Sequence, residues 1–227
     1  MAIGLLNGEA LMMCDFVQAR WGLWHADVLL QGDAAPAEGA AVTLTLGTVE
    51  RAGTVINSGA PYGQARARIV GGAGKLQAGA LLVPSDYSQV GLDVVARDIL
   101  TQAGETPGDL TPLASTVVEQ WQLCQETPWQ ALQRVFRARP DLDLWCEHNG
   151  SLSARSVTWT QIFSTQDVRG LKPQERQLVL MIDDSIVEPG IVVSTVYGDY
   201  RCERVQYELD PSDTRSALTA RVWYPKG

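Results

Sequence analysis

The sequence TPWQALQRVFRARPDLDLWCEHNGSLSARS, residues 127–156, carries the signals of one helix followed directly by one β-hairpin. Thr127 can cap the helix, Pro128 suits the first helical position, and Gln130 completes a Thr-x-x-Gln capping box. The helix should end near Arg139, because the proline that follows disfavours helical geometry in the residue before it. This half of the stretch therefore predicts a short helix with well-defined ends.

The second half of the stretch predicts the hairpin. Leu142, Leu144 and Cys146 recur at every second position, which is the period of a β-strand. Asn149-Gly150 then predicts a tight turn, because both turn residues need positive φ and these two tolerate it best. Residues 151–157 form the expected return strand.

Another amphipathic helix is predicted upstream, over residues 90–103. Its apolar side chains recur at spacings of three and four residues, and they are Leu92, Val95, Ala96, Ile99, Leu100 and Ala103. Gly104 is placed to end this helix. The polar, proline-containing residues 106–112 predict a loop.

The two ends of the chain have the two-residue period and frequent turn residues of β-structure. Val42, Leu44 and Leu46 alternate with threonine, and Arg66 and Arg68 should share one face of another strand. Later strands are expected at 178–182, 191–196, 205–209 and 218–224.

The predicted fold class is α+β, mostly β, with two small β-barrel domains flanking a compact α/β unit of helix, helix and hairpin. We expect an N-terminal β-barrel domain at 1–84, an α/β middle domain at 85–157 and a C-terminal β-barrel domain at 158–227. Several short strands with closely spaced turn signals are typical of small barrels.

Composition excludes some functions. The 227 residues are 45% hydrophobic and 19% charged, with 26 acidic and 18 basic side chains and a net charge of −8. This balance disfavours a general nucleic-acid coat or docking on anionic membranes, because both need a basic surface. The N-terminus lacks a basic stretch, so no signal peptide is predicted. No apolar run approaches the ~20 residues of a membrane helix, and we expect a cytoplasmic fold.

Two motifs suggest chemistry on first inspection. Gly71-Gly72-Ala73-Gly74-Lys75 resembles a phosphate loop, but Ile69 replaces its first glycine and Leu76 its hydroxyl residue, so a β-turn is predicted. Asp183-Asp184, near Glu188, could form an acid cluster. Neighbouring strand residues point to opposite faces, so a solvated pair is predicted instead.

Histidine and cysteine chemistry is also sparse. His25 and His148 are the two histidines, and neither has a recognisable nucleophile or second carboxylate beside it. The cysteines lack C-x-x-C spacing and predict isolated buried thiols, although convergence of all four on a metal stays open; they are Cys14, Cys124, Cys146 and Cys202. No catalytic, cofactor-binding or metal-binding residue is predicted, and no enzymatic activity.

Tryptophan and arginine are frequent. There are seven tryptophans against three phenylalanines, and arginine far outnumbers lysine. Tryptophan is often an interface anchor, and the planar guanidinium of arginine suits pairing with carboxylates between subunits. Both features favour an assembling protein.

The helix at 90–104, the Thr127-Pro128-Trp129 helix and the hairpin at 142–152 follow one another in an order that resembles the middle region of tailed-phage baseplate hub proteins. These are the late-control-protein-D-like hubs of Mu-like phages and related secretion tips. The turn Glu188-Pro189-Gly190 resembles part of a second barrel of that family.

The resemblance implies a structural virion protein at the tail tip, assembled in the host cytoplasm. It implies a homotrimer whose paired barrels mimic a six-fold ring, joining the tail tube or distal tail ring to a central spike or fibre. DNA would pass through the ring without specific recognition, and an acidic chain would not adhere to it. The alternatives are a hexameric distal tail protein, a cell-wall-degrading tail-tip hydrolase and a carbohydrate-binding module that uses exposed tryptophans.

Overall fold

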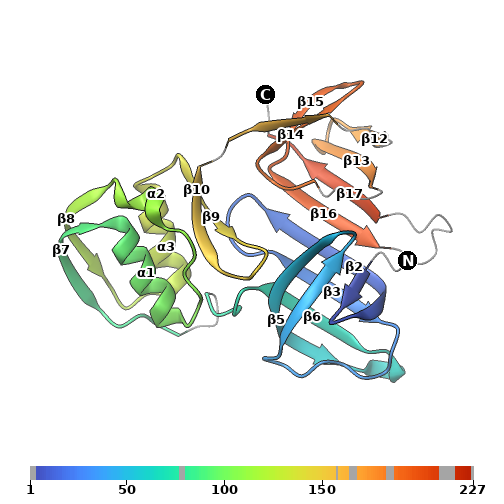
Figure 1. The fold of residues 1–227 in the computed structure, drawn as a ribbon, viewed down its shortest axis with the longest axis horizontal. Coiled ribbons are helices and arrows are strands. Elements are labelled where there is room, and N and C mark those ends of the chain that lie inside the picture. The colour runs from blue at the N-terminus through green and yellow to red at the C-terminus, as the bar shows by residue number, and fades with distance from the viewer. Residues whose placement is uncertain are drawn as a thin grey trace. The chain divides into compact units, whose positions relative to one another are not determined.

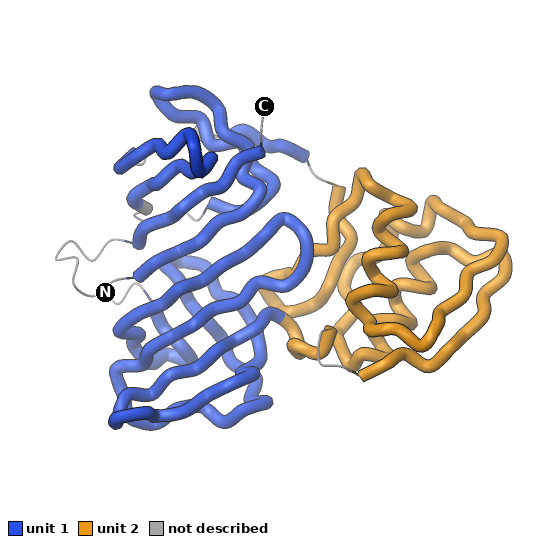
Figure 2. Tube along the Cα trace, turned by 180° about the vertical axis from the view of Figure 1, so that it is seen from behind, with its two compact units in different colours: residues 1–71, 158–227 blue, residues 72–157 orange. Residues whose placement is uncertain are grey.

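The structure is a computed structural model that describes residues 4–76, 80–156, 158–163, 168–182, 187–209 and 218–225. The chain divides into two compact units, which Figure 2 colours separately. Unit 1 combines Met1–Gly71 with Thr158–Gly227, and unit 2 is Gly72–Val157. The middle of the chain is therefore inserted into one β-rich unit. The finer division into domains at 1–84, 85–157 and 158–227 stays a prediction.

Six antiparallel strands of unit 1 close into a β-barrel (Figure 1). Their order is β1-β4-β5-β6-β3-β2, and pairing of β2 with β1 closes the barrel. Closure pairs the strand edges that an open sheet would leave free. The six strands are β1 (Gly4–Leu6), β2 (Glu9–Ala19), β3 (His25–Leu30), β4 (Ala41–Leu46), β5 (Val49–Gly59) and β6 (Arg66–Gly71). A short 3₁₀ helix, η1 (Pro61–Gly63), connects β5 to β6.

Strand β2 also joins the barrel to the end of the chain. It has 11 residues and pairs with the three-residue β1 only at its start, so the rest of that edge pairs with β16. The sheet then continues in the order β16-β17-β13-β12. A separate sheet has the order β11-β14-β15, with β11 parallel to β14. The added strands are β11 (Thr160–Phe163), β12 (Val168–Lys172), β13 (Gln177–Ile182), β14 (Ile191–Thr195), β15 (Gly198–Arg201), β16 (Arg204–Leu209) and β17 (Leu218–Trp223).

The mostly β class with a few helices is confirmed. The second barrel predicted for 158–227 is not shown, because the strands of that region form the extension of β2 and the β11-β14-β15 sheet, and the described residues contain no strand pairing between them. The sequence pattern located β13, β14, β16 and β17 but not β11, β12 and β15, and it could not decide strand pairing, since alternation identifies a buried face and not a neighbour.

The core of unit 1 is continuous across the shared strand β2. Phe16, Trp24 and Tyr207 are fully buried. The Phe16 ring centroid lies 5.5 Å from that of Trp24 and 5.7 Å from that of Tyr207. Close approach of β5 is part of this packing: a Cβ on Gly53 would lie 2.6 Å from the Val70 carbonyl oxygen and 2.7 Å from the Trp24 ring. Only glycine fits there without displacement of the core.

Two Asn-Gly pairs behave differently. Asn7 and Gly8 both have positive φ, at 50° and 86°, and form the two-residue turn from β1 to β2. In the hairpin predicted at Asn149-Gly150, only Gly150 has positive φ, at 83°. Its N–H donates to the Glu147 carbonyl at 2.9 Å, which is the longer turn with a bulge glycine. The hairpin is confirmed, and the tight turn predicted for it is wrong.

Unit 2 combines three helices with two small sheets. The capping box is confirmed: the Thr127 hydroxyl accepts a hydrogen bond from the Gln130 N–H, and the Gln130 side chain accepts one from the Thr127 N–H. Gly104 ends the upstream helix with φ at 76°. The elements are β7 (Ser85–Gly91), α1 (Leu92–Ala103), α2 (Thr111–Ala114), β8 (Val117–Leu123), α3 (Pro128–Arg137), β9 (Leu142–Cys146) and β10 (Leu152–Ser156). Within the described ranges, none of the helices is long and apolar enough to cross a membrane.

The hairpin of β9 and β10 is the centre of unit 2. Every residue of β9 is buried, so both faces are covered rather than the single face that alternation suggests. The loop predicted at 106–112 runs along the edge of β10: the Gly108 N–H donates to the Leu152 carbonyl at 2.8 Å, and the Asp109 N–H donates to the Ser153 hydroxyl at 2.9 Å. The prediction is wrong for residues 111 and 112, which begin α2.

Candidate functional site

The outer face of unit 1 carries a row of polar side chains from five neighbouring strands. Asn57 on β5 is paired with Arg68 on β6, and Arg68 is paired with Asp27 on β3. Asp27 is paired with Asp15 on β2, and Asp15 with Glu208 on β16. A β-bulge directly before Asn57 brings that residue into register with Arg68. We call these five residues the polar row.

The charges of the polar row are partly compensated. The Arg68 Nε and Nη2 donate to the two Asp27 carboxylate oxygens at 2.8 and 2.7 Å. Asp15 accepts a 2.8 Å hydrogen bond from the Gln206 amide, and Glu208 accepts one at 2.6 Å from Arg221. Paired strand positions bring the like-charged Asp15 and Asp27 together, which destabilises a sheet. A row that keeps this repulsion on its surface is a candidate for contact with a charged partner.

His25 lies on the same face as Asp27, two residues away on β3. Partial burial is the main cause that lowers its pKa, and the positive charge of Arg68 lowers it further. The imidazole is therefore neutral at pH 7, and His25 adds no charge to this surface.

A groove of about 750 Å³ is lined by all five residues of the polar row, three of which are carboxylates. Its apolar lining includes Met13, Leu29 and Pro61, and Arg66 adds a further charge at its wall. The Met13 side chain is exposed.

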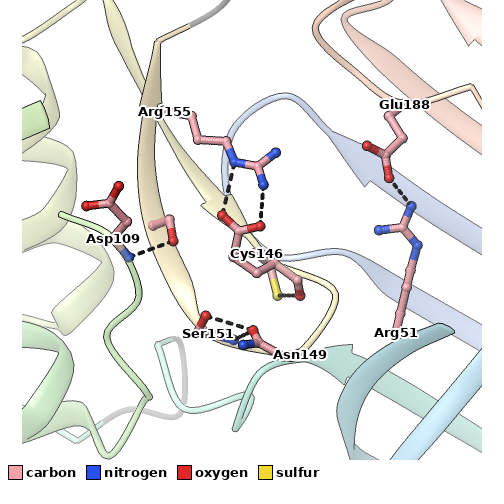
Figure 3. A network of polar contacts seen from close by, with 9 residues as sticks. Arg51, Asp109, Cys146, Asn149, Ser151, Arg155 and Glu188 are labelled. Atoms are coloured by element: carbon pink, nitrogen blue, oxygen red, sulfur yellow. Dashed lines mark hydrogen bonds and ion pairs between the residues drawn. The ribbon is translucent and has the colours of Figure 1, made fainter. Parts of the chain in front are cut away.

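Glu188 does not belong to an acid cluster in the described residues. Its carboxylate pairs with the Arg51 guanidinium at 2.7 Å, as Figure 3 shows. Arg51 is 1% exposed and lies over the Phe16 ring, 5.1 Å from the ring centroid. This ion pair holds the segment that precedes β14 against the barrel strand β5. Asp183-Asp184 lies outside the described residues.

A hydrogen bond also holds the backbone carbonyl next to Glu188. The Tyr207 hydroxyl donates a hydrogen bond to the carbonyl oxygen of Val187, the residue before Glu188. Complete burial raises the pKa of Tyr207 well above its ordinary value, so the hydroxyl keeps its proton and acts as a donor.

The glycine-rich loop at 71–75 binds an internal carboxylate. The Ala73 and Lys75 N–H groups donate to the two Glu105 oxygens at 2.8 and 2.6 Å. Glu105 is buried, and a Cβ on Gly72 would lie 2.7 Å from one of its oxygens. Backbone amides that could hold a phosphate are thus directed at Glu105, in accord with a structural turn.

The cysteines are free thiols in different environments. Cys14, Cys146 and Cys202 are buried, whereas Cys124 is exposed. Burial is the main cause that raises the pKa of the Cys14 and Cys202 thiols, so both stay protonated. Across the part of the chain that the structure describes, no group of three or more histidine, cysteine or acidic side chains is arranged to hold a metal ion.

Several arginine guanidinium groups stack on tryptophan rings of the same chain. Arginine guanidinium groups lie 4.8–5.8 Å from the ring centroids of four tryptophans, which are Trp121, Trp145, Trp159 and Trp223. All seven tryptophans are buried or half-buried. The interpretation of both residue types as interface anchors is therefore not needed, because stacking inside the chain uses the planar guanidinium equally well.

His148 lies exposed in the β9–β10 loop of unit 2. The loop is held by Asn149, whose side-chain oxygen accepts hydrogen bonds from the Ser151 N–H at 3.0 Å and hydroxyl at 2.7 Å (Figure 3). Arg155 pairs with Glu147 across the hairpin. These contacts stabilise the hairpin. The two histidines lie in different units, His25 in unit 1 and His148 in unit 2.

Local sequence patterns identify only Arg68 among the five residues of the polar row. The alternation predicted that Arg66 and Arg68 share a face, and both are exposed on β6 as expected. Asp15, Asp27 and Glu208 also sit at alternating positions, but strand pairing alone brings them beside Arg68.

The architecture is similar to that of several solved structures, although the sequence is not similar to a known family. No family model matches the sequence, and no curated protein matches it. Solved structures do match. The 43 kDa tail protein of prophage MuSo2 from Shewanella oneidensis has a TM-score of 0.70 and 10% identity, over 98% of this chain and 97% of that one. A tail protein from Neisseria meningitidis MC58 has a TM-score of 0.68 and 12% identity, over 99% and 97%.

A third match comes from a secretion system. The Escherichia coli c3393 protein is a component of the type VI secretion system with structural similarity to the T4 bacteriophage tail proteins gp27 and gp5. It has a TM-score of 0.71 and 12% identity, over 98% of this chain and 77% of that one. The chain therefore has the fold of phage tail proteins along almost its whole length, as the resemblance to Mu-like hubs implied.

Proposed function

We propose that this chain is a non-enzymatic structural protein of a phage or phage-like tail, which forms a homotrimeric ring at the distal end of the tail tube. It would join the tube or distal tail ring to a central spike or fibre, as a baseplate hub. The virion tail tip is its proposed location, after assembly in the host cytoplasm.

One observation carries the proposal. The fold matches the MuSo2 tail protein over 98% of this chain and 97% of that one, so the likeness includes both the β-rich unit and the inserted α/β unit. The match therefore covers the barrel, the inserted helix–hairpin unit and the returning strands together, and not the barrel alone.

The geometry of unit 1 is compatible with a two-module ring. We propose that the strands from 158 to 227 act as the second module, beside the six-stranded barrel of 1–84, with 85–157 as a separate domain. Such internal duplication would let three copies present six similar modules to a six-fold tube. The net charge of −8 would keep passing DNA from adhering to the ring.

The oligomer mass tests this proposal. Light scattering coupled to size exclusion should give the mass of three chains of 24.7 kDa each, and electron microscopy should show rings. Six chains would favour the distal tail protein. A monomer at all concentrations, or release of sugars or peptides from purified cell walls, would overturn the proposed function.

A further inference from the structure

Strand β15 has an uncovered edge. It ends the β11-β14-β15 sheet and pairs with β14 on one side. Among the described residues, no strand pairs with its other side. Gly198, Asp199 and Arg201 are exposed, and Figure 1 shows the β14–β15 hairpin at the margin of unit 1. An uncovered strand edge presents N–H and C=O groups that can pair with a further strand.

Alternation along β15 determines which backbone groups point to this edge. In an antiparallel pair, every second residue bonds the partner strand, and the residues between direct their N–H and C=O groups away from it. The Cys202 N–H donates to the carbonyl of Ile191 on β14 at 2.8 Å, in continuation of the β14–β15 register. Tyr200 therefore also bonds β14, whereas Asp199 and Arg201 direct their backbone groups to the free edge.

The two residues with outward backbone groups carry opposite charges on one face of the strand. Asp199 accepts a hydrogen bond from the Gln161 amide at 3.4 Å, and the Arg201 guanidinium lies 5.3 Å from the centroid of the Trp159 ring. Within the described ranges, neither charge has an ion-pair partner. With one acid and one base, the edge has no net charge, so two such edges can approach without repulsion.

A second copy of β15 that runs in the opposite direction matches this edge. With Tyr200 of both copies on a two-fold axis, Asp199 of each copy lies opposite Arg201 of the other. Each of these two pairs would exchange two backbone hydrogen bonds and form one ion pair. A parallel copy in register would place like charges side by side. The charge pattern therefore selects an antiparallel second copy as the occupant of the edge.

Tyr200 is placed to support the same contact. Its ring packs on that of Tyr224, with centroids 4.9 Å apart, and its hydroxyl donates to the Tyr197 carbonyl at 3.3 Å. The Thr195 hydroxyl donates to the Gly198 carbonyl at 3.2 Å and helps to close the hairpin. Because Tyr200 bonds β14, it would face its copy as a non-hydrogen-bonded pair, in which side chains lie closest. Aromatic pairs at such positions add to strand pairing.

We infer that two copies of this chain pair through their β15 edges about a two-fold axis, so that the two β11-β14-β15 sheets become one continuous sheet. The contact is isologous, because both copies use the same surface. Each copy thereby covers an edge to which unrelated strands could otherwise add. The inference goes beyond the proposed function and does not need a ring, since single chains and rings would pair through the same edge.

Charge reversal tests the register of the pairing. Asp199→Arg and Arg201→Asp each place like charges opposite one another twice, so either variant alone should weaken pairing at least about tenfold. A mixture of the two variants should pair again, because each strand then carries the charges that the other lacks. Arg137→Asp is the matched control, because Arg137 is exposed at the end of α3 in unit 2 and should leave the pairing unchanged.

Sedimentation equilibrium over a concentration series measures this pairing. The average mass should rise with concentration for the wild type, the control and the mixture, and stay constant for each reversed variant alone. A wild type of constant mass, a reversed variant that still pairs, or a mixture that does not pair would overturn the inference. The mass at the lowest concentration tests the ring, so the two proposals can fail separately.

Disulfide formation across the axis is an independent test. In a Cys124→Ser background, Tyr200→Cys chains should form a symmetric disulfide under mild oxidation, because the Cα atoms of a non-hydrogen-bonded pair lie about 4.5 Å apart, within the range of a disulfide. Val117→Cys is the control, because Val117 is 67% exposed on β8 of unit 2 and should stay reduced. Equal cross-linking of both variants, or none in Tyr200→Cys chains that circular dichroism shows to be folded, would contradict the two-fold register.

Discussion

Removing the carboxylate of Glu188 should destabilise the protein far more than removing the guanidinium of Arg51. Arg51 is 1% exposed and Glu188 is 28% exposed. In Glu188→Ala the guanidinium stays in the core without its counter-charge, and its Nη1 already has no hydrogen-bond partner. In Arg51→Met the remaining carboxylate can turn towards water, and methionine fills much of the vacated volume.

The magnitudes follow from this asymmetry. Breaking a buried ion pair by removing one partner costs about 3–5 kcal/mol, and partial exposure of Glu188 sets the low end, about 3 kcal/mol. Arg51→Met loses the stacking on Phe16, worth about 0.5–2 kcal/mol, and little else. The double variant should resemble Arg51→Met, so the two changes should be strongly non-additive.

Urea unfolding followed by tryptophan fluorescence measures these differences as changes in the free energy of unfolding. Glu203→Ala is a suitable control, because its pair with Arg20 is about one third exposed on both sides and is worth about 1 kcal/mol or less. Equal losses in Glu188→Ala and Arg51→Met, or simple additivity in the double variant, would refute the reasoning.

Three further predictions follow from single contacts. Gly53→Ala should lower the free energy of unfolding by about 1–3 kcal/mol through overpacking against the core, whereas Gly59→Ala, whose added Cβ meets only one atom at 3.9 Å, should be nearly neutral in the same urea experiment. Thr127→Ala should cost about 1 kcal/mol by removing the helix cap, and Thr127→Ser should restore it; equal stability of the two variants would contradict the capping role. A thiol reagent at pH 8 should label Cys124 alone in the folded protein and all four cysteines after unfolding, because burial keeps the other three unreactive; rapid labelling of a second thiol in the folded state would show that the core is open.

Local signals explain where sequence analysis succeeded. The cap at Thr127, the stop at Gly104 and the hairpin around Gly150 depend on residues within a few positions of one another. Backbone hydrogen bonds of that range are decided by the residues themselves, so their prediction does not need the rest of the fold.

The turns and strands that were predicted wrongly or not at all have a common cause. Asn7-Gly8 is a two-residue hairpin turn that the sequence analysis does not predict, whereas Asn149-Gly150, for which a tight turn is predicted, forms a longer one. Strands β7 and β8 were not predicted, because their exposed and half-exposed residues lack a clear alternation. Turn type and strand identity depend on the partner strand, which a local pattern does not contain.

Local sequence patterns suffice for the mostly β composition, for helices α1 and α3 with their ends, and for the β9–β10 hairpin. Tertiary packing decides that β2 serves both the barrel and the C-terminal strands, and that Arg51 pairs with Glu188, 137 residues away along the chain. It likewise decides that the polar row crosses five strands. The reason is that propensity and capping act over a few residues, whereas pairing and burial are settled by the free energy of the whole core.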